Sequence, residues 1–138
     1  MKIIIINGPN LNLLGKREVD IYGKISFDDY FMILKQKYSD FQIDYFQSNI
    51  EGEIINRIQD SDKDYNAILI NAGGYSHTSV AILDAIKTIS CQVIEVHISN
   101  IYSREEFRTR SLLSSACKSV ICGFGLKSYD LAIHSLRT

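Results

Sequence analysis

The sequence is poor in features that would place it in a specialised class of protein. It holds three cysteines, Cys91, Cys117 and Cys122, which form neither a disulfide framework nor a C-x-x-C pair. This excludes structural zinc sites and thioredoxin-like redox motifs of the usual spacing. We expect buried thiols in a reducing compartment, because a free cysteine behaves as a small hydrophobic residue.

Long apolar runs and an excess of one charge are also absent. The stretch Ile3–Ile6 is far short of a signal-peptide core or a membrane span, and it suits a buried strand. A net charge of −1 argues against a general polyanion binder, which would be clearly basic, but it leaves room for a local basic pocket. We therefore expect a cytoplasmic protein without a membrane or nucleic-acid partner.

What remains is an ordinary globular composition. The chain has 138 residues, of which 46% are hydrophobic and 22% charged, and this length fits one domain that buries a substantial core. No repeat, low-complexity stretch or long charge run divides it, and Pro9 is the only proline. We expect residues 1–138 to form a single domain.

Short β-branched runs alternate along the chain with longer helical patterns. Strands are predicted over Lys2–Asn7, Phe41–Phe46, Ala67–Ile70, Gln92–His97 and Ser119–Cys122. Helices are predicted from an N-cap at Ser26 to about Tyr38, over Glu51–Asp60, over Ser79–Ile89 with Thr78 as cap, and from Ser103 with a Ser103/Glu106 capping box. Gly123 and Gly125 lead into a last predicted helix that ends near Leu136. Apolar strands separated by helices predict an α/β fold, a flavodoxin-like doubly wound five-stranded parallel sheet of order 2-1-3-4-5.

In such sheets a ligand binds outside the carboxyl ends of the strands. Asparagines, histidines and arginines follow three of the predicted strands, in the segments Asn7–Asn12, Asn71–His77 and His97–Asn100, with Arg104 and Arg108 beyond. These side chains should gather on one edge of the sheet. Asparagine and glycine are also common turn residues, so each asparagine taken alone has a structural explanation.

The connection after the first strand is unusually long for this class of fold. It runs from Gly8 to about Ile25, contains Arg17 and Tyr22, and is bounded by glycines. Long loops over such a crevice are candidate lids, and we predict one at about residues 15–25. A solvated surface loop is the alternative.

Several motifs, in order along the whole chain, resemble the type II 3-dehydroquinate dehydratases. They are Gly8-Pro-Asn-Leu-Asn-Leu-Leu-Gly15, Arg17-Glu18, Tyr22-Gly23, Gln47-Ser48-Asn49, Glu51-Gly52-Glu53, Asn71–Ser79, Glu95-Val-His-Ile-Ser-Asn100, Arg104-Glu-Glu-Phe-Arg108 and Gly123-Phe-Gly125. The flavodoxin-like order and the lid are also features of that family. The resemblance implies an enzyme that eliminates water from 3-dehydroquinate through an enolate and gives 3-dehydroshikimate.

The resemblance also implies a role for individual residues. Tyr22 matches the family's base, His97 its general acid, Arg17 the lid arginine, and Asn10 the residue that steadies the enolate through a held water. The implied substrate-binding residues are Asn71, His77, Ile98, Ser99 and Arg108. Asp84 matches a position that reaches a neighbouring subunit's site, which implies a homododecamer built from trimers.

These residue types suit the implied chemistry. The ordinary pKa of tyrosine is about 10, so a tyrosinate at neutral pH needs that pKa lowered by about 2–3, and the Arg17 cation can contribute this.

His97 must be protonated to help hydroxide leave. Glu95, two residues earlier, would lie on the same sheet face and pair with it, or would instead meet a helix or another subunit. His77, at a helix start, suits hydrogen bonding better than the acid role. No step moves electrons or phosphate, so we expect no cofactor and no metal.

Departures from the family pattern are few. The segment Asn71–Gly74 reads Asn-Ala-Gly-Gly where Asn-Pro-Gly-Ala is usual, Ile50 replaces a usual histidine, and Thr109–Ser111 is atypical.

The competing interpretations are a flavin or nucleotide module, a receiver-like signalling domain, and a catalytically inactive scaffold or binding module. The first lacks its phosphate loop after the first strand, and the second lacks an acidic cluster at the strand ends. Shikimate-pathway biosynthesis of aromatic amino acids is the commoner setting of such chains, although quinate breakdown uses the same step.

Overall fold

A computed structural model describes residues 1–16 and 18–137, without the side chain of Tyr22. Its described strands form one parallel sheet of order β2-β1-β3-β4-β5. The strands are β1 (Lys2–Asn7), β2 (Gln42–Gln47), β3 (Ala67–Asn71), β4 (Gln92–His97) and β5 (Ser119–Cys122). The predicted flavodoxin-like order is therefore confirmed, and each strand boundary lies within one residue of its predicted position.

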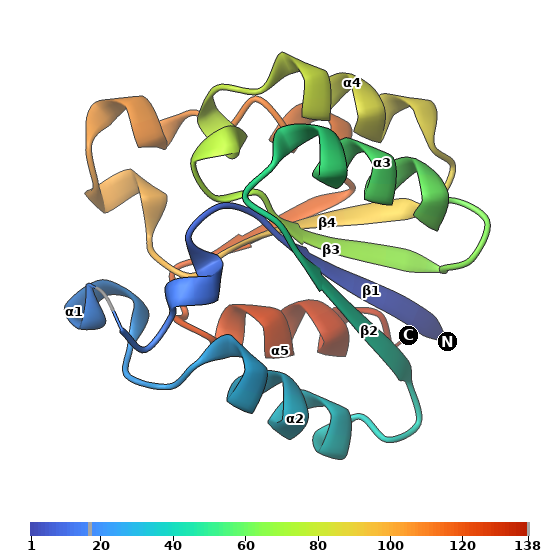
Figure 1. Ribbon diagram of the computed structural model, residues 1–138, viewed down its shortest axis with the longest axis horizontal. Coiled ribbons are helices and arrows are strands. Elements are labelled where there is room, and N and C mark those ends of the chain that lie inside the picture. Colours follow the sequence, from blue (N-terminus) through green and yellow to red (C-terminus); the bar gives the residue numbers. More distant parts are fainter. Residues whose placement is uncertain (17, 138) are drawn as a thin grey trace.

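The central strands are apolar because both faces of the sheet are covered. Helices α3 (Glu51–Ser61) and α4 (Val80–Thr88) lie over one face, and α2 (Phe27–Lys37) and α5 (Lys127–Ser135) lie over the other (Figure 1). All four isoleucines of Ile3–Ile6 are fully buried, and they alternate between the two hydrophobic cores. The edge strand β5 differs, since Ser119 and Val120 are exposed.

Hydroxyl side chains set two of the helix starts. The Ser26 Oγ accepts a hydrogen bond from the Asp29 N–H at 3.1 Å, as predicted for the cap of α2. The predicted Thr78 cap is wrong, because the Ser79 Oγ accepts from the Ile82 N–H at 2.9 Å and so caps α4. Thr78 instead ends the short 3-10 helix η2 (Gly73–His77).

The segment after β4 also differs from the prediction. It forms the 3-10 helices η3 (Ile101–Ser103), η4 (Glu106–Thr109) and η5 (Ser114–Ala116). Ser103 ends η3 and donates to the Asn100 carbonyl at 2.9 Å, so no capping box forms with Glu106. None of the described helices is long and apolar enough to cross a membrane.

The long connection after β1 is partly helical. It contains η1 (Leu11–Leu13) and a four-residue helix α1 (Val19–Tyr22). Figure 1 shows this connection at the same end of the sheet as the segment that follows β4. The loops that were predicted to carry the chemistry therefore gather at the carboxyl ends of the strands.

Candidate active site

A cavity of about 130 Å³ opens at the carboxyl ends of β1, β3 and β4. The predicted site residues that line it are Asn10, Asn71, His77, His97, Ile98, Ser99 and Arg108. The remaining lining residues are Pro9, Leu11, Leu14, Gly73, Gly74, Ile101 and Arg104. The edge that the sequence predicted as the binding site is thus a real pocket, lined by amides, imidazoles and guanidinium groups.

Two backbone segments pack closely against each other beside this pocket. Asn7 and Asn71 are paired in register at the ends of β1 and β3, and the Gly8 N–H donates to the Asn71 carbonyl at 2.7 Å. A Cβ atom on Gly8 would lie 2.5 Å from the Ala72 carbonyl oxygen, a distance that atoms of this kind do not reach. Only glycine therefore allows the two loops to leave the sheet side by side.

Asn10 lies where the first loop turns into η1. Its φ of 70° is in the left-handed region, which asparagine tolerates better than most residues. Its N–H donates to the Asn49 Oδ1 at 3.0 Å, and the Gln47 amide donates to the same oxygen at 3.2 Å. Asn49 and Gln47 thus hold the Asn10 backbone from β2 and the loop after it. Only the resemblance in this segment signalled them, and neither was predicted as a site residue.

His77 has a defined tautomer in this arrangement. Its Nδ1 lies 2.7 Å from the Arg110 carbonyl oxygen. A carbonyl can only accept, so Nδ1 carries a proton and Nε2 is left as the acceptor of the neutral ring. The rings of His77 and His97 lie nearly parallel, with their centroids 6.1 Å apart. The two imidazoles therefore share one side of the pocket.

His97 has an acidic neighbour. Glu95 is fully buried on β4, and its Oε1 lies 3.4 Å from the His97 Nε2. The same carboxylate accepts hydrogen bonds from the Ser111 and Ser114 hydroxyls. Burial raises the pKa of Glu95, but the contacts with His97, Ser111 and Ser114 outweigh it and lower that pKa overall. The carboxylate is therefore ionised, and of the partners left open by the sequence it contacts His97.

Two arginines give the pocket local positive charge despite the nearly neutral chain. Arg108 donates from Nε to the Glu105 carboxylate at 2.7 Å. Arg104 donates from Nη1 to the Ser99 hydroxyl at 3.3 Å. Arg104 was expected at this edge but was not assigned to the substrate. Its position in the pocket lining makes it a further candidate for binding an anion.

Three predicted site residues are not brought into the described pocket. Asp84 lies exposed on α4 and is not among the lining residues. Arg17 and the side chain of Tyr22 lie outside the described residues. The backbone of Tyr22 is described and forms the last residue of α1.

Comparison with known proteins gives one family. The model of the family described as dehydroquinase class II matches residues 1–137. A 3-dehydroquinate dehydratase of Clostridium botulinum (strain Loch Maree / Type A3) is 56% identical over 133 residues, which cover 95% of this chain and 90% of the relative. One from Caldicellulosiruptor saccharolyticus is 52% identical, covering 99% of this chain and 96% of the relative.

Solved structures agree with the sequence comparisons. The crystal structure of the type II dehydroquinase from Butyrivibrio crossotus has a TM-score of 0.96 and 44% identity, and the match covers 100% of this chain and 98% of that one. The type II dehydroquinase from Propionibacterium acnes has a TM-score of 0.94 and 38% identity, over 98% and 94% of the two chains. The family expected from the sequence motifs, that of a hydro-lyase, is confirmed. This chain belongs to the class II dehydroquinase family.

Proposed function

We propose that residues 1–138 form a single catalytic domain that eliminates water from 3-dehydroquinate and gives 3-dehydroshikimate through an enolate. The observation that carries this proposal is the buried, ionised Glu95 in contact with His97 at the wall of the pocket. That pair supplies an acid where a leaving hydroxide needs one. The family relationship supplies the substrate, since the relatives above are named 3-dehydroquinate dehydratases.

His97 acts as the general acid. Its Nε2 lies towards Glu95, which leaves Nδ1 as the ring nitrogen that can act in the pocket. When the ring is protonated, Nδ1 donates to the departing hydroxyl, and the Glu95 carboxylate offsets the positive charge of the imidazolium. His77 suits this role less well, because its Nδ1 faces the neutral Arg110 carbonyl and not a carboxylate that would offset the charge of an imidazolium.

Tyr22 acts as the base that removes the proton beside the ketone. The Arg17 cation, five positions away in the same loop, favours the tyrosinate, and closure of a lid at about residues 15–25 strengthens that effect by excluding water. Asn10 steadies the enolate through a held water. These three roles are carried over from the family motifs, and Asn10 is the one of the three that lines the described pocket.

The remaining lining residues bind the ring substituents. Ile98 and Ser99 offer backbone N–H groups at the end of β4, and Arg108 offers a guanidinium for the carboxylate. Arg104, held beside Ser99, adds a second cation. Asn71 and the His77 Nε2 meet the ring hydroxyls. Hydrogen bonds of this kind orient the ring so that both proton transfers can occur.

Two further expectations belong to this proposal. The reaction serves aromatic amino acid biosynthesis in the cytoplasm. The chain assembles into a homododecamer built from trimers, in which the exposed Asp84 of one subunit reaches the site of its neighbour. Its exposure on α4, away from its own pocket, supports this placement.

An ultraviolet assay tests the reaction and its base together. Purified protein is mixed with 3-dehydroquinate in chelator with no cofactor added, and formation of the conjugated enone is followed by absorbance. We expect the absorbance to rise rapidly with the wild type and hardly at all with Tyr22→Phe. Tyr102→Phe is the matched control, because Tyr102 is 67% exposed and does not line the pocket.

The other outcomes are equally informative. A rise in absorbance with both the wild type and Tyr22→Phe would support the reaction but show that Tyr22 is not its base. No rise in absorbance with a folded wild type would support the inactive scaffold instead.

A further inference from the structure

Three buried polar side chains from distant parts of the chain meet beside the pocket. Asn7 ends β1, Asn71 ends β3, and Tyr129 belongs to α5. The Asn71 Nδ2 lies 2.9 Å from the Tyr129 hydroxyl, which lies 2.8 Å from the Asn7 Oδ1. Asn7 and Tyr129 are fully buried and Asn71 is 4% exposed. Of the three, only Asn71 lines the pocket.

One backbone group fixes the direction of these hydrogen bonds. The Gly73 N–H lies 3.2 Å from the side-chain oxygen of Asn71 and can only donate. The atom beside Gly73 must therefore be Oδ1, and the atom beside Tyr129 must be the donor Nδ2. The Tyr129 hydroxyl accepts from Asn71, and its own proton is left for Asn7.

The phenol keeps that proton at neutral pH. Burial raises the pKa of Tyr129 far above its ordinary value, and the hydrogen bonds with Asn71 and Asn7 only partly oppose this. A neutral phenol can accept one hydrogen bond and donate another, so with the Asn71 Nδ2 fixed as a donor by Gly73 the order runs from Asn71 to Tyr129 to Asn7. Turning the Asn71 amide over would face its Nδ2 towards the Gly73 N–H, and that N–H would lose its acceptor.

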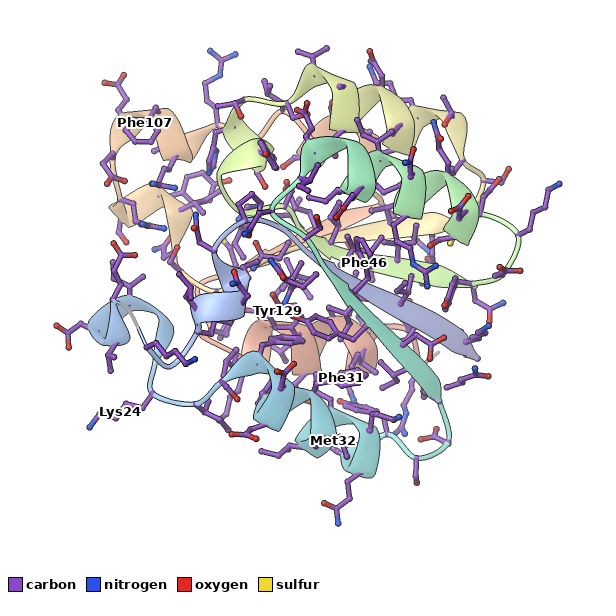
Figure 2. The ribbon with its side chains drawn as sticks, in the orientation of Figure 1. Lys24, Phe31, Met32, Phe46, Phe107 and Tyr129 are labelled. Atoms are coloured by element: carbon purple, nitrogen blue, oxygen red, sulfur yellow. The ribbon has the colours of Figure 1, made fainter. Side chains whose placement is uncertain are left out.

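The Tyr129 ring is held independently of its hydroxyl. It packs edge-on against Phe27, with ring centroids 4.9 Å apart, within the core between the sheet and α5. Figure 2 shows Tyr129 between α5 and the sheet. Replacing tyrosine by phenylalanine should keep this packing and remove only the two hydrogen bonds.

We infer that Tyr129 and Asn7 are positioning residues that lock the amide of Asn71 in one orientation towards the substrate. Neither side chain lines the pocket, so both act through Asn71. We call the hydrogen bonds that join Asn7, Tyr129 and Asn71 the lock. The lock determines which atoms of the Asn71 amide face the substrate, since Oδ1 faces Gly73 and one Nδ2 hydrogen faces Tyr129. This inference rests on the proposed function for its substrate, although the lock itself is independent of the reaction.

A double-mutant cycle separates positioning from a structural effect. Steady-state kinetics with 3-dehydroquinate are measured for the wild type, Tyr129→Phe, Asn71→Ala and the double variant. Tyr129→Phe should lower kcat/KM about tenfold, mainly through KM, the size expected for one buried hydrogen bond. In the Asn71→Ala background the same change should cost nothing further. An equal loss in both backgrounds would overturn the inference.

Tyr38→Phe is the matched control. Tyr38 is 1% exposed, belongs to the same core, and donates from its hydroxyl to Asp130 on α5, away from the pocket. It should lower the melting temperature while leaving KM unchanged, and a tenfold rise in KM would contradict the inference. If Tyr129→Phe fails to fold, Asn7→Ala tests the lock from its other end, with a rise in KM that again vanishes beside Asn71→Ala.

A measurement without substrate distinguishes failure of this inference from failure of the proposed function. In ¹⁵N-labelled protein, the side-chain amide signal of Asn71 should move and its protons should exchange faster in Tyr129→Phe but not in Tyr38→Phe. If the wild type has no dehydratase activity and the signal still moves, the proposed function fails while the lock stands. An unmoved Asn71 signal would overturn the lock whatever the activity.

Discussion

Replacing Glu95 by Gln would test the charge beside the proposed acid with little change of shape. The carboxylate oxygen lies 3.4 Å from the His97 Nε2. Opposite unit charges at that distance attract by about 5 kcal/mol at an effective dielectric constant of 20. A neutral amide keeps a polar contact that is worth about 1 kcal/mol. The protonated ring of His97 thus loses about 3–4 kcal/mol of electrostatic stabilisation, and kcat should fall about 10²- to 10³-fold.

The assay is the absorbance assay above, run at saturating 3-dehydroquinate with the wild type and Glu95→Gln. Asp130→Asn is the matched control, because Asp130 also accepts from a hydroxyl and an ammonium group but does so away from the pocket. It should change kcat little. A kcat for a folded Glu95→Gln within about threefold of the wild type would refute the reasoning, since it would show that His97 needs no countercharge.

Three further predictions concern stability and reactivity. Gly8→Ala should unfold at a clearly lower temperature in calorimetry, because its Cβ would collide with the Ala72 backbone. The contacts that lower the pKa of Glu95 stabilise the fold above the unfolded-state pKa, and this contribution is lost as the pH falls through the lower folded-state value. Urea unfolding at a series of acidic pH values should therefore show a flatter loss of stability in Glu95→Gln than in the wild type. Burial raises the pKa of Cys91 to about 11 and that of Cys117 to about 12, so mass spectrometry should find both nearly unalkylated after brief iodoacetamide treatment of the native protein at pH 8.

The sheet could be predicted because its central strands carry an unmistakable signal. Runs such as Ile3–Ile6 are apolar at every position, which only a strand or helix covered on both sides tolerates, and their length favours a strand. Helix starts were less certain, since Thr78 and Ser79 are adjacent hydroxyl residues. Both can cap, and only the three-dimensional path of the chain decides that Ser79 reaches the Ile82 N–H.

The pocket could be predicted in outline because parallel strands end at the same edge of a sheet. The hydrogen-bond partners of its residues could not be predicted. The spacing of Glu95 and His97 places both on one face, but Ser111 and Ser114 come from an irregular segment whose path no periodicity encodes. Tyr129 carries no local signal either, since a tyrosine in an amphipathic helix is ordinarily a core residue.

The hydrogen bond between Tyr129 and Asn7 joins residues 122 positions apart. Contacts of such long range form late when a chain folds, because the entropy of closing the loop must be overcome before they contribute. The first strand of the chain and its last described helix must both be in place before the Asn71 amide is held. Recovery of the full kcat/KM during refolding should therefore wait until both elements are in place. Full catalytic efficiency in this protein thus depends on the two ends of the described chain being folded together.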